Sequence, residues 1–384
     1  MGRLPIQYVK EIGYPIMAVF GVPEGILKIK TATKAAIEDI TYSSLIFISN
    51  KIIAIITVTF QDSRLLHLID YFPVVLGPTA NLMTAVILSR GKCGLSRGIT
   101  RYMVAMAISD LLVMIFHVLL YQIFSYHFPS SFLSLTAICP SHAYLRIVTL
   151  DYSVWLTVSF TFDRFISICC QKLRLRYCTE RTAAVVIVSM FVLSCLKFIP
   201  YLFMFESKFM MDNLWWGCKI KTVFTSAGWV TFAWICSLSV SLLPFFLILL
   251  LNGLTVRHIL AASRVRRVLK GLASGQNQSD SEMENRQKSI ILLFAVSGSY
   301  ILLWMTGTVT FVCTRITFDA LERNLASPGY IASDVGRLLI LMNSCANTCI
   351  YGLTQSKFRE EVKKAVKYLL TRVTKLMNLK QQSG

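Results

Sequence analysis

Residues Ala143–Cys170 read AYLRIVTLDYSVWLTVSFTFDRFISICC, and this segment decides the fold class. A helix that crosses a lipid bilayer needs about 20 predominantly apolar residues, and the segment exceeds that length. Charged side chains are expensive inside hydrocarbon, so each one there needs a partner or a role. Four occur here: Arg146, Asp151, Asp163 and Arg164. The segment predicts a membrane-spanning helix with unusual ionisable positions.

Six further segments share this length and apolar composition. Short polar or basic connections separate them, and they lack the alternation of apolar and polar residues that is typical of a membrane β-barrel. We therefore expect an all-α membrane protein, a seven-transmembrane helix bundle. The six segments are Phe72–Leu88, Tyr102–Phe124, Ala183–Phe205, Ala227–Leu251, Ser289–Cys313 and Ile331–Leu353.

The composition supports the same class. Of the 384 residues, 55% are hydrophobic and 15% charged, too apolar for a soluble or disordered chain. The formal net charge of +19 makes nucleic-acid binding the rival interpretation. However, Lys and Arg concentrate in the connections after the first, third and fifth spans and in the tail, which the positive-inside rule makes cytoplasmic. We therefore expect contact with membrane lipid and no nucleic-acid partner.

The residues before the first span fit less well. Ser44–Phe60 is apolar but short, and Lys51 lies at its middle. Length and charge favour an extracellular or surface-lying segment over an eighth membrane helix. Residues 24–67 are a genuine extension, an extra membrane segment or an insert that interrupts the first helix. We divide the chain into an N-terminal extension (1–67), a seven-transmembrane domain (68–355) and a cytoplasmic amphipathic helix with the tail (356–384).

Two of the 11 cysteines are clearly extracellular in this topology. Cys139 lies at the outer start of the third span, and Cys218 lies in the next outer loop. The oxidising side of the membrane allows a disulfide between them. Such a bridge would attach the outer loop to the third helix.

Seven spans, basic inner loops, paired outer cysteines and the Asp163-Arg164 pair together resemble a rhodopsin-like (class A) G-protein-coupled receptor. Motifs of that family recur in order over about residues 70–370. The sequence segments FTFDRF…ICC and NTxxYGLTQSKFRE are similar to those of an orphan branch of this receptor family, and some members of that branch are linked to aromatic amino acids. The matching positions are Asn81, Asp110, Pro244, Trp304, Asn347, Tyr351 and the amphipathic segment Ser356–Leu370.

Several positions depart from the family pattern. Thr348 replaces the proline of the seventh-helix motif, and Thr306 lies where a proline normally follows Trp304. Phe165 replaces the tyrosine after Asp-Arg, and Asn252 replaces the fifth-helix tyrosine. The fourth-helix tryptophan is missing. The helix kinks, if they form, then depend on Gly, Ser, Thr or bound water.

The resemblance implies a receptor that activates heterotrimeric G proteins. The predicted coupling switch consists of Asp163, Arg164 and Tyr351. Arg164 can pair with Asp163 at rest and be released to meet a partner, the kind of two-state element that signalling requires.

Asp110 is a carboxylate expected in mid-membrane, where it needs a counter-charge or a cation. Ser153, Asn343 and Asn347 would supply oxygen ligands for Na⁺, as the resemblance also implies. The alternative is a protonated Asp110 that is hydrogen-bonded to Asn81 and Asn347. We expect no other cofactor and no other metal.

Two arginines lie in the outer halves of spans. Arg146 is about 27 Å from Arg164 along the third helix, and Arg337 lies at a comparable depth on the seventh. Because buried cations require anions, we hypothesise an anionic or amino-acid-like extracellular ligand, with Trp304 below it.

The alternative to ligand binding is internal pairing. Asp334 is close to Arg337 in sequence, and Asp151 is positioned to meet Lys197 of the fourth span. The sequence leaves both interpretations open.

The function that fits best is a multi-pass plasma-membrane receptor for a small extracellular ligand. The alternative is a membrane transporter or ion-conducting helical bundle, although inverted repeats are not visible. We expect no enzyme, because the sequence shows no nucleophile–base–acid set, metal-ligand cluster or phosphate loop.

Overall fold

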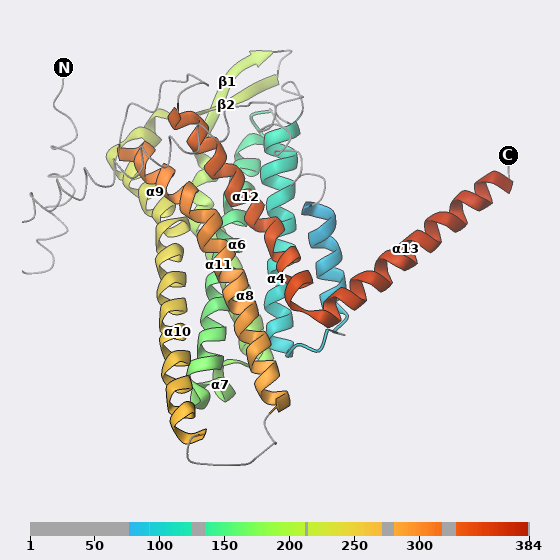
Figure 1. Ribbon diagram of the computed structural model, residues 1–384. Coiled ribbons are helices and arrows are strands. Elements are labelled where there is room, and N and C mark those ends of the chain that lie inside the picture. The colour runs from blue at the N-terminus through green and yellow to red at the C-terminus, as the bar shows by residue number, and fades with distance from the viewer. Residues whose placement is uncertain are drawn as a thin grey trace, which may run out of the picture.

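The computed structural model describes residues 77–91, 93–124, 132, 135–211, 214–270, 280–316 and 328–382. In these residues long helices lie side by side as a bundle (Figure 1). The first helix covers residues 77–89. Our predictions for residues 1–67, Ser44–Phe60 included, and for the first five residues of Phe72–Leu88 concern residues outside this description.

The helices of the bundle correspond to the predicted spans, with small differences at their ends. The second span is divided between an α-helix and a π-helix, and the fourth ends in a 3₁₀ turn. The fifth, sixth and seventh extend beyond their predicted inner or outer limits. The elements are α4 (Arg97–Val113), η1 (Met114–Phe124), α6 (Cys139–Cys169), α8 (Glu180–Phe198), η3 (Ile199–Phe203), α9 (Ala227–Val240), α10 (Leu242–Lys270), α11 (Asp280–Ile316) and α12 (Pro328–Thr354).

Local sequence signals explain several of these boundaries. The side chain of Ser96 caps α4 by accepting a hydrogen bond from the Ile99 amide, and Thr179 caps α8 by accepting from the Thr182 amide. The fifth span is interrupted at Ser241, between α9 and α10. Pro244 explains this break, because proline lacks an amide hydrogen and crowds the carbonyl four residues earlier.

The outer surface of the bundle is apolar. On α8, for example, Val188 and Leu193 are about 60% exposed, as expected for side chains that face lipid rather than water. Four stretches of the described residues are long and apolar enough to cross a membrane. They are Arg97–Tyr121, Glu180–Phe203, Ala227–Ala262 and Ile290–Val309.

The helices α6 and α12 are not among these four apolar stretches, because they carry charged and amide side chains. In α6 these include Arg146 and Asp151, and in α12 they include Asn343 and Asn347. The polar positions face the interior of the bundle, where Asp151, Asn343 and Asn347 are buried. The central helices are thus the ones that carry the polar chemistry.

A two-stranded antiparallel hairpin joins the fourth and fifth spans. It consists of β1 (Phe205–Met211) and β2 (Leu214–Ile220), with Ser207 opposite Cys218. We did not predict these strands, because FESKFMM and LWWGCKI show no clear alternation. The hairpin lies at one end of the bundle, and the short helix α7 (Gln171–Tyr177) lies at the other (Figure 1). We call these the outer and inner ends.

After α12 the chain continues as α13 (Ser356–Gln382), which is longer than the predicted segment Ser356–Leu370 and leads away from the bundle (Figure 1). Near its start Phe358 is buried and packs edge-to-face on Tyr351, with the ring centres 6.3 Å apart. The placement of α13 on a membrane surface stays a prediction.

Candidate functional site

Basic and aromatic side chains gather at the outer ends of the second, third and seventh helices. The guanidinium carbon of Arg146 lies 4.0 Å from the centre of the Tyr121 ring, and this ring stacks on His142 with centres 6.2 Å apart. Arg146 and Arg337 are both near enough to His117 to interact electrostatically with its imidazole. We call His117, Tyr121, His142, Arg146 and Arg337 the outer basic cluster.

Of this cluster, only Arg146 and Arg337 were predicted from the sequence as site residues. His117 and Tyr121 come from η1, where their rings meet edge-to-face at 6.3 Å, and His142 precedes Arg146 by one turn of α6. A spacing of four residues places side chains on the same face of a helix, so both pairs had a detectable signal. The π-helical backbone of η1 had none, although such turns are frequent at functional sites.

Arg146 has an incomplete set of interactions. Its Nε is buried and finds no hydrogen-bond partner in the described part of the chain. A cation–π contact with Tyr121 offsets only part of the cost of removing a guanidinium N–H group from water. The Arg146 Nε–H group is therefore a buried donor without an acceptor among the described residues.

Of the two internal ion pairs expected from the sequence, Asp151–Lys197 lies within the described residues and Asp334–Arg337 does not. Lys197 Nζ lies 2.5 Å from Asp151 Oδ1, so that pair forms inside the bundle. Ser194 donates to the other oxygen of Asp151 at 2.7 Å. The side chain of Asp334 lies outside the described ones, so its predicted pairing with Arg337 stays a prediction.

Trp304 lies deeper in the bundle than the outer basic cluster. It is 2% exposed and stacks on Tyr300, one turn earlier in α11, with ring centres 5.1 Å apart. Its neighbours include Val154 and Val158, two to three turns inward of Arg146 on α6. The Trp304 Nε1 and the Tyr300 hydroxyl are buried without hydrogen-bond partners among the described residues. A polar ligand or a water molecule at this depth could accept a hydrogen bond from the Trp304 Nε1–H or the Tyr300 hydroxyl.

Asp110 is fully buried at the centre of the bundle. Ser153 Oγ donates to Asp110 Oδ1 at 2.7 Å, and Asn347 Nδ2 donates to Oδ2 at 2.8 Å. Asn343, one turn before Asn347, is buried with its Oδ1 unpartnered among the described groups. The structure thus brings Asp110, Ser153 and Asn347 into contact and leaves the Asn343 oxygen available.

Asn81 is not a hydrogen-bond partner of Asp110 in the structure. Its Nδ2 donates to the Ser344 carbonyl at 2.8 Å, and its Oδ1 accepts from the Thr348 hydroxyl at 3.0 Å. Thr84 donates in turn to Thr348 at 3.1 Å. The residue that replaces the motif proline therefore connects the first helix to α12.

Asp163 and Arg164 form a buried ion pair at the inner end of α6, with Arg164 Nε 3.0 Å from Asp163 Oδ2. Tyr351, the third predicted switch residue, instead contacts Met106, whose sulfur lies 4.0 Å from the tyrosine hydroxyl. Asp163 and Arg164 are thus paired, Tyr351 lies in the neighbouring core, and their role as a coupling switch stays a prediction.

The fifth and sixth spans meet through a different polar contact. Ser297 of α11 donates to Asn252 Oδ1 of α10 at 3.0 Å, and both residues are buried. Asn252 occupies the position of the family's fifth-helix tyrosine, so this chain joins the two helices with a short amide–hydroxyl contact.

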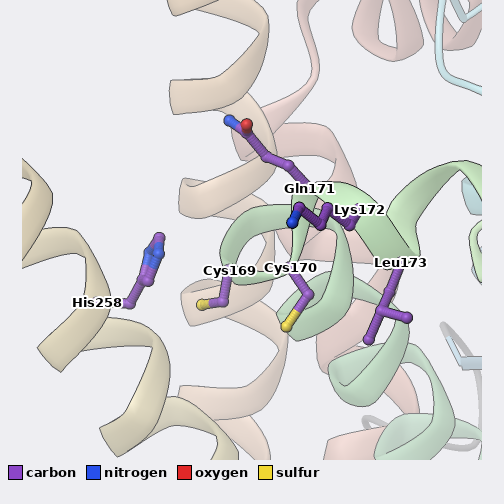
Figure 2. A pocket seen from close by; sticks show the side chains of 6 residues that line it. All are labelled: Cys169, Cys170, Gln171, Lys172, Leu173 and His258. Atoms are coloured by element: carbon purple, nitrogen blue, oxygen red, sulfur yellow. The ribbon is translucent and has the colours of Figure 1, made fainter.

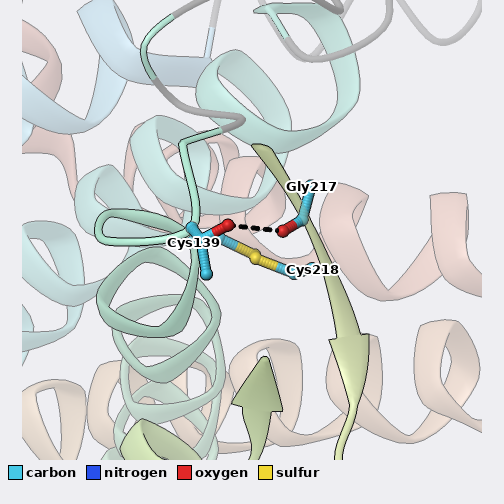
Figure 3. Close-up of a disulfide and its surroundings, with 4 residues drawn as sticks. Cys139, Gly217 and Cys218 are labelled. Atoms are coloured by element: carbon cyan, nitrogen blue, oxygen red, sulfur yellow. Dashed lines mark hydrogen bonds between the residues drawn. A yellow bond between two sulfur atoms is a disulfide. The ribbon is translucent and has the colours of Figure 1, made fainter. Parts of the chain in front are cut away.

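The disulfide between Cys139 and Cys218 is present (Figure 3), and the two Cα atoms are 6.5 Å apart. It fixes β2 to the start of α6. The Thr136 hydroxyl also donates to the Gly217 carbonyl at 2.9 Å, and Gly217 has a φ of 70°, a conformation that favours glycine. The hairpin is therefore held at the outer end of the third helix, close to the outer basic cluster.

Comparison with known proteins identifies the class. The family of seven-transmembrane receptors of the rhodopsin type matches residues 80–351. The match covers more than half of the chain, which therefore belongs to the rhodopsin family of seven-transmembrane receptors. The chain is thus a membrane protein of a receptor family rather than of an enzyme family.

One curated relative is the FMRFamide peptide receptor frpr-18 of Caenorhabditis elegans. It is 24% identical over 213 residues, which represent 54% of this chain and 46% of the relative. The chain thus matches less than half the length of this relative. The similarity is that of a distant relative within the family.

Proposed function

We propose that this chain is a multi-pass plasma-membrane receptor that binds an extracellular ligand through an anionic group and activates heterotrimeric G proteins. The observation that carries the proposal is Arg146, whose buried Nε lacks a hydrogen-bond partner among the described residues. Arg337 and His117 add positive or polar character around it. A carboxylate is the complementary group, because arginine binds it through two parallel charge-assisted hydrogen bonds.

Two ligand classes satisfy this chemistry. The resemblance to an orphan branch linked to aromatic amino acids favours a small amino-acid-like ligand. The relative that is a peptide receptor favours a peptide with an acidic side chain or a free carboxyl end. In both cases the aromatic ring of Tyr121 and, at greater depth, Trp304 supply apolar contact surface.

Transmission to the inner end requires elements with two arrangements. The stacked Tyr300 and Trp304 lie between the outer basic cluster and the inner half, and a move of either ring would break no hydrogen bond of its own polar atom to a described residue. At the inner end, release of Arg164 from Asp163 would expose a guanidinium to a G protein. Tyr351 would join this switch after it leaves Met106.

Asp110, Ser153 and Asn343 fit a bound Na⁺. Hard cations prefer oxygen ligands, and Asn343, whose Oδ1 is unpartnered among the described groups, lies one helical turn from Asn347, the residue that contacts the Asp110 carboxylate. Na⁺ would supply the counter-charge that a buried carboxylate needs. Asn347 presents its Nδ2 to Asp110, so its role is to orient the carboxylate unless its amide is reversed.

The test begins with guanine-nucleotide exchange on purified G proteins, in the presence of a panel of aromatic amino acids and short acidic peptides. For every ligand that stimulates exchange, Arg146→Gln is expected to lower the potency by about tenfold to a hundredfold, because a charge-assisted contact is lost. The exposed Arg90→Gln serves as the matched control and should retain the potency of the original chain.

Equal potency of Arg146→Gln and the original chain for all active ligands would contradict the anion site. Substrate-dependent flux across proteoliposomes without any nucleotide exchange would favour the transporter alternative instead.

A further inference from the structure

A pocket of about 520 Å³ lies at the inner end of the bundle, between the end of α6 and α10 (Figure 2). It does not belong to the ligand site or to the Asp110 network. Its lining contains two adjacent cysteines and two basic side chains. The lining residues are Cys169, Cys170, Gln171, Lys172, Leu173 and His258.

The backbone presents the two cysteines at a turn. Cys169 is the last residue of α6, and Cys170 leaves the helical conformation with φ −121° and ψ 72°. In Figure 2 the Cys169 side chain points toward the side where His258 of α10 lies, and the Cys170 side chain points in another direction. Both residues are half-buried rather than enclosed in the core of the bundle.

The helix that follows has the composition of a segment at a membrane surface. In α7 the apolar residues Leu173 and Leu175 are 45% and 86% exposed, and basic residues alternate with them. Exposed leucines beside Lys and Arg suit the boundary between acyl chains and anionic headgroups. The cysteine pair thus lies where a membrane-spanning helix meets this boundary.

We propose that the pair Cys169–Cys170 is an S-acylation site that carries a long-chain fatty acyl group. The thiolate attacks the carbonyl carbon of a long-chain acyl-CoA, a new carbon–sulfur bond forms, and the bond to the CoA sulfur breaks. CoA leaves as a thiol and takes up the proton that the cysteine lost. Juxtamembrane cysteines are the usual acceptors of this reversible modification.

Other cysteines of the inner end are poorer acceptors. Burial and the nearby Asp163 raise the pKa of Cys178 to about 11, and its sulfur lies 3.4 Å from the Asp163 carbonyl as a hydrogen-bond donor. Burial, with a smaller contribution from Glu361, also raises the pKa of Cys93. Since the thiolate is the nucleophile, a raised pKa suppresses reaction.

The acyl chain would act with α7 as an anchor for the inner end of α6. Residues 356–384 contain no cysteine, so the segment after α12 offers no acceptor thiol. A chain on Cys169 or Cys170 would enter the lipid beside α7. This holds the turn next to Asp163 and Arg164 at a fixed depth in the membrane.

The experiment uses the full chain expressed in animal cells. Free thiols are blocked, thioesters are cleaved with hydroxylamine, and the released thiols are coupled to a polyethylene-glycol maleimide that shifts the band on a gel. We expect a hydroxylamine-dependent shift for the original chain, its loss in the double variant Cys169→Ser/Cys170→Ser, and its retention in Cys178→Ser.

Absence of the shift in the original chain, or its persistence in the double variant, overturns the proposal. Surface labelling of each variant, together with the two single variants, distinguishes a lost thioester from a lost fold. The readout needs neither ligand nor G protein, so it stands apart from the proposed receptor function.

Discussion

At the scale of single residues, Thr348 is the clearest example of a side chain whose role depends on its neighbours. The family motif has a proline here, and a proline could neither donate nor accept through a side chain. In this chain the Thr348 hydroxyl accepts from Thr84 and donates to Asn81. The first helix and α12 are consequently joined by hydroxyl and amide groups inside an apolar environment, where each such bond is costly to lose.

We predict that Thr348→Val lowers the free energy of unfolding by about 1–3 kcal/mol, because Asn81 and Thr84 lose a buried partner while the side-chain volume is kept. Denaturation of the purified receptor in detergent measures the effect. Thr371→Val is the control, since that exposed hydroxyl donates to the Lys367 carbonyl of its own helix. Equal losses in both variants would contradict the proposed connection.

Some residue-level predictions followed from chemistry alone. Cysteines placed on the same oxidising side could be paired from topology, whereas the pair Asp151–Lys197 was one of two open interpretations until the structure showed it. Asn81 was different. Its amide has several possible partners at similar depth, and only the rotation of the first helix about its own axis decides that Ser344 and Thr348 are the ones.

At the scale of elements, the Asp151–Lys197 pair connects three helices. Asp151 lies on α6 and Lys197 on α8, and Lys197 Nζ also lies 3.1 Å from Ser239 Oγ on α9. Ser239 is just before the break at Ser241. The discontinuity that Pro244 introduces into the fifth span is thereby tied to the third helix by a charged hydrogen-bond chain.

We predict that Asp151→Asn destabilises the fold by about 3 kcal/mol, because removal of one partner leaves the Lys197 ammonium without its counter-charge. The combination Asp151→Leu/Lys197→Met should cost less than the sum of its single changes. Thermal unfolding in detergent gives the values. As a control, Glu206→Gln breaks the exposed hairpin pair with Lys219 and should cost less than about 1 kcal/mol. A result in which the exposed pair matters as much would refute this reasoning.

The helices themselves were predictable because an apolar run of sufficient length has few alternatives in a membrane. The hairpin β1–β2 and the π-helix η1 were not, since both depend on tertiary contacts rather than on the local pattern. The hairpin is held by the disulfide and by the antiparallel bridge between Leu135 and Trp216. No property of FESKFMM taken alone indicates those contacts.

At the scale of the whole molecule, the arrangement of charges predicts which loops lie outside the cell. Asn277-Gln278-Ser279 is a glycosylation sequon in the basic connection between α10 and α11, which we place inside. The hairpin belongs to the opposite end. An engineered sequon there should be used, whereas the natural one should not.

We predict that Trp215→Ser, which creates the sequon Asn213-Leu-Ser, adds a glycan that an endoglycosidase removes, while the original chain carries none at Asn277. Trp215 is 56% exposed, so its replacement leaves the core intact. The measurement is a gel shift after enzyme treatment of receptor expressed in animal cells. A glycan on Asn277 would show the reverse orientation.

The helix α12 runs without interruption from Pro328 to Thr354, and it carries Arg337 in its outer half and Tyr351 near its inner end. These two residues are about 21 Å apart along one rod. A helix without a break moves as one rigid body, so a displacement of α12 at the level of Arg337 would also move Tyr351. In this chain a displacement at the outer end of α12 would reach the inner end as a movement of the whole helix. The hydrogen bonds of Thr348 to Asn81 and Thr84 would hold α12 against the first helix during that movement.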